Sequence, residues 1–550
     1  MMATWLLLSA ALLAVGETHT AHDHPAAGSA GPAAVSVPLF DDLGTYHRAV
    51  STKKPLVQKY FDQGLRLVYG FNHDEAERAF REAARLDPKC APCFWGVALT
   101  LGPNINLPID PERNAKAVEA VSRAKSLESR ARPVEKALID ALSVRYSAEA
   151  NADRATLDQA YADAMRGVVR RFPDDDDAAT LFAESLMDLH PWKLWTQDGQ
   201  PAPGTLEAVS SLETVLKRNP THPGANHYYI HATEASPDPG RALASAKRLE
   251  TLVPGAGHLV HMPAHTYMRT GDYAGASAAN DKAAKVDEAY IAKTHAEGVY
   301  PAMYYTHNLQ FLAAAAAMEG RSMVSLEAAR KTTEIALKVA KDMPMAEFVV
   351  PWSIYYSLRF GKLDDVLALP APDPALPTAT ALWRFGRAYA LAAVGKMDEA
   401  AAENAAFEAA RAAVPADAMM NLSPSSSLLA VAAAMIQAKT AEAKGQTDAA
   451  IAAWKNAVEL EDALPYDEPP AWYYPTRESL GGACLRAGKF PEAEAVFRED
   501  LERNPGNARS LFGLAKALEG QQKSAEAAKV EKQFKEAWKA ADVEANVTEL

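Results

Sequence analysis

A spacing of 34 residues connects two histidine-rich segments and restricts what this chain can fold into. His227 and His231 in the first segment are each followed 34 positions later by another histidine, at His261 and His265. Repeats of this length are pairs of antiparallel helices that stack on their neighbours and bury a continuous core. Equivalent histidines in such an array are expected to lie side by side on adjacent helices. The spacing therefore predicts an all-α array with a histidine-lined site in its middle.

Small and aromatic residues recur with the same period elsewhere in the chain. Small side chains let paired helices approach closely, and a proline stops the second helix of a pair. The segments predicted to be in register are 57–90, 223–256, 257–290, 474–507 and 508–541, with further helix pairs near 134–173, 176–220, 306–341 and 380–412. Residues 191–203 and 290–305 are expected to be insertions, which often help to build a site in repeat arrays.

The N-terminus predicts export from the cytoplasm. Residues 5–15 form an apolar run that is too short to span a bilayer, as in a signal peptide cleaved after Gly16 or slightly later. No later segment is long and apolar enough for a membrane span, so the mature chain is expected to be periplasmic or secreted. In an oxidising compartment, Cys90 and Cys93 are expected to form a local disulfide. The net charge of −13, with no basic cluster, argues against nucleic acid as a partner.

Three longer strings resemble an exported bacterial subgroup of the tetratricopeptide-repeat (TPR) family. They are Tyr-Ile-His-Ala-Thr-Glu-Ala-Ser at 229–236, His-Leu-Val-His-Met-Pro-Ala-His-Thr-Tyr-Met-Arg-Thr-Gly-Asp-Tyr at 258–273 and Tyr-Asp-Glu-Pro-Pro-Ala-Trp-Tyr-Tyr-Pro at 466–475. The resemblance implies a superhelical solenoid whose first helices present one stripe of residues to a concave groove. It implies no particular biochemical activity.

This organisation divides the chain into seven predicted segments. They are a signal peptide at 1–16, a flexible tail at 17–37, N-terminal TPR-like repeats at 38–173, central repeats with the histidine-rich site at 174–341, alanine-rich TPR-like repeats at 342–470, C-terminal TPR repeats at 471–541 and a tail at 542–550.

The central histidines fall on helical stripes. His227, His231 and Glu234 are spaced i, i+4, i+7, which places them on one face of a helix. In the repeat register, the same stripe of the next unit carries His258, His261 and His265, while His307 and Glu184 come from the units after and before. Pro263 indicates an alternative to this arrangement. A proline often begins a helix, and a helix that begins at Pro263 would leave His258 and His261 in the preceding loop.

A shared hollow lined by these side chains suits a transition-metal ion. Neighbouring helices lie about 8–10 Å apart, so facing imidazoles can converge on one ion with bonds of about 2.0–2.1 Å. Nitrogen ligands favour copper or zinc, with iron as a third candidate, over calcium or magnesium. The predicted metal ligands are His227, His231, His258, His261, His265, His307 and Glu184, and Glu234 is the candidate catalytic base.

Three functions stay open at this stage, and the sequence does not decide whether the protein is an enzyme. The first is a metal-dependent oxidoreductase or hydrolase that acts on a small-molecule or peptide ligand in the groove. The second is a metal-free scaffold for a peptide or protein partner, and the third is a metal-handling protein that captures ions with His19, His22 and His24. The absence of histidines after His307 favours a localised centre over a binding track along the whole groove. A second candidate surface, to which no mechanism is assigned, consists of the aromatic residues Trp472, Tyr473 and Tyr474 with Asp467 and Glu468.

Overall fold

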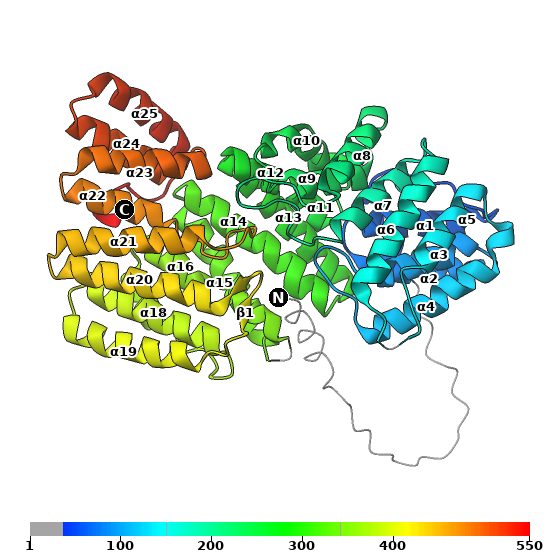
Figure 1. Cartoon of the computed structure of the whole chain (residues 1–550), viewed down its shortest axis with the longest axis horizontal. Coiled ribbons are helices and arrows are strands. Elements are labelled where there is room, and N and C mark those ends of the chain that lie inside the picture. Colours follow the sequence, from blue (N-terminus) through cyan, green and yellow to red (C-terminus); the bar gives the residue numbers. More distant parts are fainter. Residues whose placement is uncertain (1–36, 150, 342) are drawn as a thin grey trace, which may run out of the picture. The chain divides into compact units, whose positions relative to one another are not determined.

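The computed structural model describes residues 37–149, 151–341 and 343–550 (Figure 1). The described residues form two compact units. Unit 1 comprises residues 37–41, 46–68 and 72–174, and unit 2 comprises residues 42–45, 69–71 and 175–550. The predicted signal peptide, nearly all of the predicted tail and its histidines His19, His22 and His24 lie outside the described residues.

Unit 1 consists of helices joined by short turns. The helices are α1 Pro55–Val68, α2 His73–Leu86, α3 Ala91–Leu101, α4 Pro111–Ser126, a short 3-10 turn Glu128–Arg130, α5 Pro133–Ser143 and α6 Arg154–Arg171. The predicted repeat at 57–90 is the pair α1 and α2, which confirms that register. A Cβ added at Gly64 would lie 2.8 Å from the Phe80 ring, so only glycine lets the two helices approach this closely.

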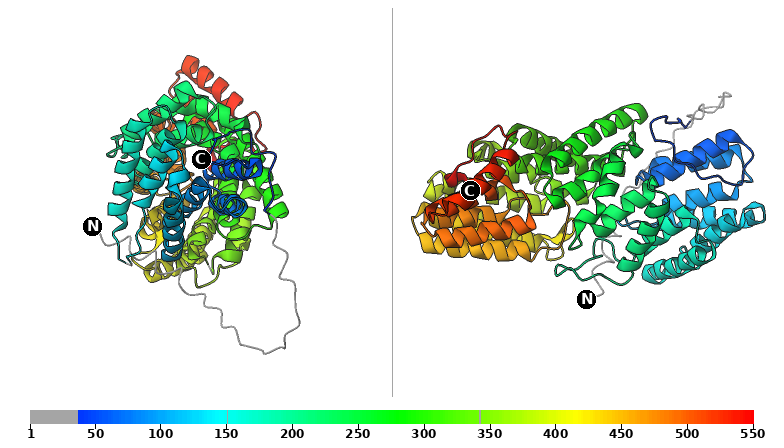
Figure 2. Two further views of the ribbon diagram at one scale, coloured as in Figure 1. Left: turned by 90° about the vertical axis from the view of Figure 1, so that its right-hand side faces the viewer. Right: turned by 90° about the horizontal axis from the view of Figure 1, so that it is seen from above.

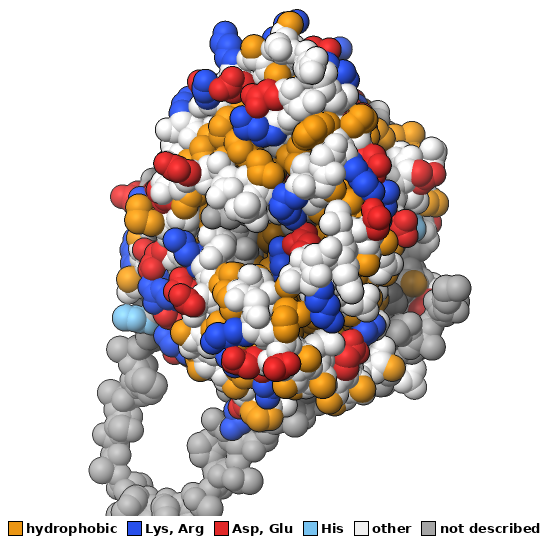
Figure 3. Space-filling model, turned by 90° about the vertical axis from the view of Figure 1, so that its left-hand side faces the viewer, with side chains coloured by type: hydrophobic (Ala, Val, Ile, Leu, Met, Phe, Trp, Pro, Cys, Tyr) orange, Lys and Arg blue, Asp and Glu red, His pale blue; other side chains and the backbone are white. Residues whose placement is uncertain are grey.

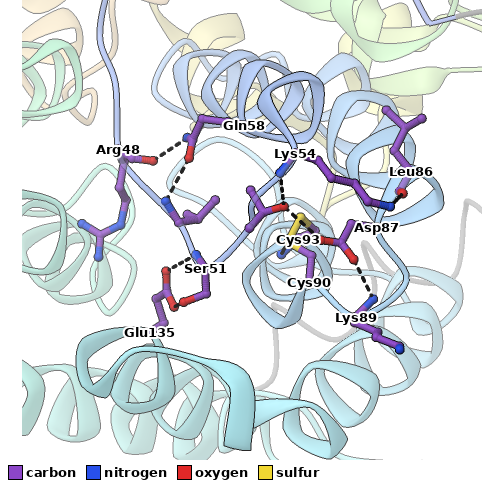
Figure 4. The surroundings of a disulfide bond; sticks show 12 residues. Arg48, Ser51, Lys54, Gln58, Leu86, Asp87, Lys89, Cys90, Cys93 and Glu135 are labelled. Atoms are coloured by element: carbon purple, nitrogen blue, oxygen red, sulfur yellow. Dashed lines mark hydrogen bonds between the residues drawn. A yellow bond between two sulfur atoms is a disulfide. The ribbon is translucent and has the colours of Figure 1, made fainter.

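A disulfide joins Cys90 and Cys93 at the start of α3, as expected for a local pair (Figure 4). Cys90 is the residue that caps this helix, and its Sγ atom accepts the backbone N–H of Cys93. The preceding turn is fixed by Asp87, whose carboxylate accepts from the Thr52 hydroxyl at 2.9 Å and from the Lys89 backbone N–H at 3.3 Å. The disulfide therefore closes the first turn of α3, directly after the turn that Asp87 fixes.

Unit 2 is also built from helix pairs. Its helices are α7 Asp176–Met187, α8 Thr205–Arg218, α9 Pro223–Thr233, α10 Leu243–Leu252, α11 Gly257–His261, α12 Pro263–Thr270, α13 Tyr273–Thr294, α14 Thr306–Met318, α15 Ser322–Val339, α16 Trp352–Arg359, α17 Leu363–Ala368, α18 Pro377–Ala393, α19 Met397–Ala413, α20 Ser425–Ala443, α21 Thr447–Asp462, α22 Thr476–Arg486, α23 Phe490–Arg503, α24 Ala508–Gly520 and α25 Ser524–Ala537. Shorter turns of helix are η2 Pro239–Ala242, η3 Tyr300–Tyr305, η4 Pro344–Val349 and η5 Val547–Glu549. The strands in the described parts of the chain are the two-residue segments β1 Met419–Met420 and β2 Ser423–Pro424, so the predicted all-α class is confirmed.

The C-terminal helices of unit 2 stack as antiparallel pairs from α18 to α25 (Figure 2). Their shared core includes the large buried rings of Phe385, Trp454 and Trp472. A Cβ at Gly481 on α22 would lie 2.4 Å from the Phe497 ring on α23, which repeats the close approach of α1 and α2. The face of these helices in Figure 3 carries acidic and basic side chains interspersed with apolar ones. Among the helices that the structure describes, none has the length and apolar character that crossing a membrane requires.

The two predicted insertions differ in structure. Residues 191–203 form an irregular excursion between α7 and α8, closed by a single bridge between Trp195 and Pro201. The second insertion begins later than predicted, because residues 290–294 continue the helical hydrogen bonding of α13. It then includes η3, a π-helical turn that leads directly into α14. Both excursions bring aromatic side chains to the central histidines.

Candidate metal centre

Four helices of unit 2 position the central histidines, and all lie in the green part of Figure 1. Helix α9 carries His227 and His231 and ends at Glu234, its C-terminal cap. Its first turn is fixed by Pro223 and by His222, whose Nδ1 accepts the Ala225 N–H at 3.0 Å. The other three helices carry the remaining candidate ligands: His258 and His261 on α11, His265 on α12 and His307 on α14.

Pro263 does begin a helix, but the residues before it are helical as well. Helix α11 ends at His261 and α12 starts at Pro263. Met262, at the junction between them, keeps right-handed helical backbone angles. The prediction that His258 and His261 could fall in a loop is therefore wrong. The proline removes one backbone donor at its own position, where a new helix does not need it.

The six predicted histidines form two groups of three. In each group, one candidate ligand atom from every residue lies within 4.8 Å of the others. We call them the first triad, His227, His231 and His258, and the second triad, His261, His265 and His307. Glu234 belongs to a third group, with His231 and His265. The sequence prediction that these histidines converge is thus matched by the geometry.

Hydrogen bonds at Nδ1 fix the tautomer of four rings. His227 Nδ1 lies 2.7 Å from the Tyr69 carbonyl oxygen, which can only accept, so this nitrogen carries the proton. His261 Nδ1 donates in the same way to Asn280 Oδ1 at 2.7 Å, because the Asn280 amide nitrogen already donates to the Ala276 carbonyl. A neutral imidazole has one N–H, so the Nε2 atoms of these rings expose a lone pair.

Glu234 fixes the other two rings. One carboxylate oxygen accepts from His231 Nδ1 at 2.8 Å, and the other accepts from His265 Nδ1. Both oxygens are thereby engaged, and the side chain is 3% exposed. This is the arrangement by which a carboxylate orients histidine ligands, so the contacts support a positioning role for Glu234. The role of Glu234 as a catalytic base stays a prediction.

Burial disfavours the charged form of most of these rings. Desolvation lowers the pKa of His227, His258 and His261 well below the usual histidine value, and neighbouring rings lower it further. The same effects lower the pKa of His307 to about 3. Burial opposes ionisation of Glu234, but the adjacent His265 and His231 outweigh it and hold the pKa of that carboxyl below its usual value. The centre therefore combines one carboxylate with several imidazoles, among them His227, His258, His261 and His307, whose charged form is disfavoured.

Aromatic rings enclose the first triad. Phe71 lies against three histidine rings, with centroid distances of 4.5 Å to His227, 5.3 Å to His258 and 6.0 Å to His231. Trp192, from the first insertion, meets His231 edge-on at 5.9 Å. Phe71 and Trp192 have φ angles of 55° and 58°, a left-handed conformation that bulky residues rarely adopt. Such strain is typical of functional sites, where surrounding structure holds it in place.

The second triad is enclosed by Phe311, one turn after His307 on α14. The Phe311 ring lies 4.7 Å from His261, 4.6 Å from His265 and 4.9 Å from His307, measured between centroids. The predicted open groove is consequently covered here. His227, His261 and His265 are 0% exposed, because Phe71, Trp192 and Phe311 occupy the face that the repeat pattern alone leaves open.

The second candidate surface predicted from the sequence is not exposed, because its aromatic and acidic residues are buried. Two residues of this segment, Tyr466 and Glu468, instead belong to the surroundings of the centre. Arg269 donates to the Glu234 backbone carbonyl at 3.1 Å and stacks over the Tyr466 ring at 5.6 Å. The Tyr466 hydroxyl donates to Glu468 at 2.6 Å. Burial raises the pKa of Glu468 to about 7, although the positive charge of Arg269 opposes this. A protonatable carboxyl is thus connected to Glu234 through Arg269. The sequence does not indicate this connection, because more than 190 residues separate Arg269 from the segment that contains Glu468.

Glu184 does not join the histidine groups. It lies on α7 and is 6% exposed, but none of the three groups contains it. Its role as a ligand stays a prediction. The insertion at 191–203 separates α7 from its partner helix, so the 34-residue spacing does not extend to the helix that carries Glu184. Asn280, Tyr69 and Phe71 are functional neighbours that the sequence pattern did not indicate.

The donor set suits a late transition metal. Three imidazoles converge in each triad, and two of the Nε2–Nε2 separations are 3.1 Å, between His227 and His258, and 2.8 Å, between His261 and His265. Tetrahedral ligands at the bond lengths of zinc or copper are about 3.3 Å apart. Backbone carbonyl, amide and carboxylate partners at Nδ1 are the outer contacts that metal-bound histidines use. The residues present therefore fit a metal ion.

One comparison with known proteins identifies a repeat segment near the C-terminal end of the chain. Residues 480–542 match the family model described as tetratricopeptide repeat. Among solved structures, the human IFIT1 dimer with m7Gppp-AAAA is 12% identical, with 88% of this chain and 91% of that chain covered and a TM-score of 0.31. Yeast Tom70 is 13% identical, with 88% and 93% covered and a TM-score of 0.28. A search of curated proteins finds no match. With TM-scores this low, the two structural likenesses carry no argument about the fold or the ligands.

Proposed function

We propose that this tetratricopeptide-repeat protein binds late first-row transition-metal ions through its six central histidines. The observation that carries the proposal is the orientation of the rings. Four of them are held at Nδ1 by a carbonyl, an amide or a carboxylate, so that each Nε2 lone pair points toward other histidines. Copper and zinc suit such a set best, and iron is the third candidate.

Burial favours this reading over a metal-free peptide groove. A groove that recognises peptides must present its polar side chains to the incoming chain, whereas five of the six histidines are at most 5% exposed. Buried polar nitrogens without a partner are costly. His231 Nε2 and His258 Nδ1 accept or donate no hydrogen bond within the described part of the chain, and a bound cation would satisfy one atom of each ring.

A metal held here would supply Lewis-acid or redox chemistry, and we propose a metal-dependent oxidoreductase or hydrolase for a small substrate. This chain contributes the positioning of ligands by Glu234 and the exclusion of water by Phe71, Trp192 and Phe311. His307 is the one partly exposed member of the six, so access is most direct beside α14. A second candidate is metal storage or transfer, which the enclosure of the other five histidines favours.

We further propose that the mature protein works in the periplasm or outside the cell. The apolar run at 5–15 and the Cys90–Cys93 disulfide support this location, because disulfides persist in oxidising compartments.

Elemental analysis of the purified protein tests the metal proposal. After dialysis without chelator, we expect near-stoichiometric copper, zinc or iron in the wild type and its loss in a His231→Ala/His265→Ala double variant. The matched control is His295→Asn, because His295 is exposed and adopts a left-handed cap conformation, φ 52°, that asparagine tolerates. A wild type that retains no ion and binds added ions no more tightly than micromolar would redirect the assignment to a metal-free scaffold.

A further inference from the structure

The two triads have no member in common, and each has the composition of a complete site. Three histidines and one open position are the usual coordination of a catalytic zinc or copper ion. One four-coordinate ion cannot use six imidazoles, so half of the ligands would be idle in a mononuclear centre. The triads are nevertheless adjacent: ring centroids are 5.1 Å apart between His231 and His265 and 5.6 Å apart between His258 and His261.

The second triad requires a positive charge of its own. His261 and His265 both donate from Nδ1, to Asn280 and Glu234, so both Nε2 atoms carry lone pairs. These two Nε2 atoms face each other at 2.8 Å, where two lone pairs repel. A proton or a metal ion between the rings removes the repulsion.

The first triad presents lone pairs independently. His227 and His231 are protonated at Nδ1 by the same argument, so their Nε2 atoms are available as ligands. His258 Nε2 lies 3.1 Å from His227 Nε2. Its other nitrogen forms no hydrogen bond in the described residues, which leaves the ring able to adopt either tautomer. This triad can therefore hold an ion without any ligand from the second.

We propose that the centre is dinuclear, with one copper or zinc ion in each triad. The proposal rests on the metal-binding function proposed above. Glu234 links the two halves, since one of its oxygens orients a ligand of the first triad and the other orients a ligand of the second. The third group, His231, Glu234 and His265, is then a positioning device, because its contacts are hydrogen bonds made through Nδ1.

Metal titration of the full mature chain tests the proposal. Protein freed of metal with a chelator is titrated with Cu(II), and bound copper is measured after gel filtration. We expect two ions per chain in the wild type and in the His295→Asn control. A His227→Asn/His258→Asn variant and a His261→Asn/His307→Asn variant should each hold one. Asparagine keeps an amide donor near the former Nδ1 and removes the Nε2 ligand, so the His227 and His261 contacts are preserved.

Electron paramagnetic resonance gives a second readout that does not depend on the variants folding. Two Cu(II) ions in adjacent triads couple magnetically, so the wild-type signal should be well below two spins per chain. Each triad variant should show an uncoupled one-spin signal. Two ions with full-intensity signals would overturn the proposal, because such ions are too far apart to be neighbours.

Stoichiometry separates this proposal from the one on which it rests. Saturation of the wild type at a single ion overturns the dinuclear centre and leaves the metal-binding function intact. Binding of no ion removes both. A Glu234→Gln variant addresses the remaining alternative: if Glu234 only positions ligands, the variant still takes up two ions, with weaker affinity. Loss of one whole equivalent would instead identify Glu234 as a ligand and overturn the assignment of one ion to each triad.

Discussion

Replacing Glu234 by glutamine changes one atom of a buried side chain and tests the logic of the whole centre. The carboxylate accepts two hydrogen bonds, from His231 Nδ1 and His265 Nδ1. A glutamine amide has one oxygen, so it can accept only one of them and presents N–H groups to the other ring. That second ring must move its proton to Nε2. Its Nε2 then binds a metal ion only after losing this proton, so metal affinity falls without the loss of a site.

The magnitude follows from these two contacts. Hydrogen bonds to a charged group contribute about 1.5–3 kcal/mol each, against about 0.5–1.5 kcal/mol for a neutral one. Exchanging two of the former for two of the latter should destabilise the metal-free protein by about 2–3 kcal/mol. Loss of an orienting partner typically reduces metal affinity about 10–100-fold. We expect both effects in Glu234→Gln.

Two assays measure them. Equilibrium urea denaturation, followed by circular dichroism, gives the stability of the metal-free protein, and competition with a coloured chelator gives the metal affinity. The matched control is Glu319→Gln, because Glu319 is also a buried carboxylate, 6% exposed, but bonds to Ser277 and Arg321 instead of a histidine. An unchanged metal affinity in Glu234→Gln would refute the tautomer argument, since the ring orientations would then not depend on this carboxylate.

Three further perturbations address other parts of the structure. Gly224→Ala places a Cβ 2.3 Å from the Tyr69 ring, whose residue also provides the carbonyl for His227, so thermal denaturation should show lower stability and titration weaker metal binding. A Cys90→Ala/Cys93→Ala variant should lose about 2 kcal/mol in urea denaturation, because so short a loop constrains the unfolded chain only slightly. Glu468→Gln should change the pH dependence of stability. Because burial raises the pKa of Glu468 to about 7, the folded wild type keeps a proton that the unfolded chain releases above about pH 4.5. The free energy of unfolding of the wild type therefore falls by about 3 kcal/mol as the pH rises through this window, and the variant lacks that loss.

Each of these has a control. Gly167→Ala should be neutral or mildly stabilising, since a Cβ there meets no atom within 4 Å. Cys484 is a single buried thiol, so Cys484→Ala reports on cavity formation without disulfide loss. Parallel slopes for wild type and Glu468→Gln between about pH 4.5 and 7 would contradict the buried, protonated carboxyl.

The helix pairs and the converging histidines were predictable because both depend on periodicity. His231 and His265, 34 residues apart, do lie on neighbouring helices with rings 5.1 Å apart. The finer pairing was not predictable. His227 meets His258, which is 31 residues away and lies about one helical turn before its repeat equivalent His261.

The aromatic residues that cover the histidines could not be predicted from the repeat pattern, for a different reason. Phe71 and Trp192 reach the histidines from segments far along the chain and with left-handed backbone angles, which no propensity argument assigns to bulky residues. The tautomers depend on a backbone carbonyl at Tyr69 and an amide at Asn280, and neither partner has a distinctive spacing from the histidine that it contacts. Glu468 likewise becomes relevant only through Arg269.

The origin of the six histidines has a consequence for how the array unfolds. They come from three successive layers, α9, then α11 with α12, then α14. In a solenoid each layer contacts only its neighbours, so structure is normally lost progressively from the ends. Ions bound across three layers make their opening concerted, and the loaded middle of the array should exchange its amide hydrogens as one block while outer layers fray separately. Metal supply would then set the size of the cooperative unit.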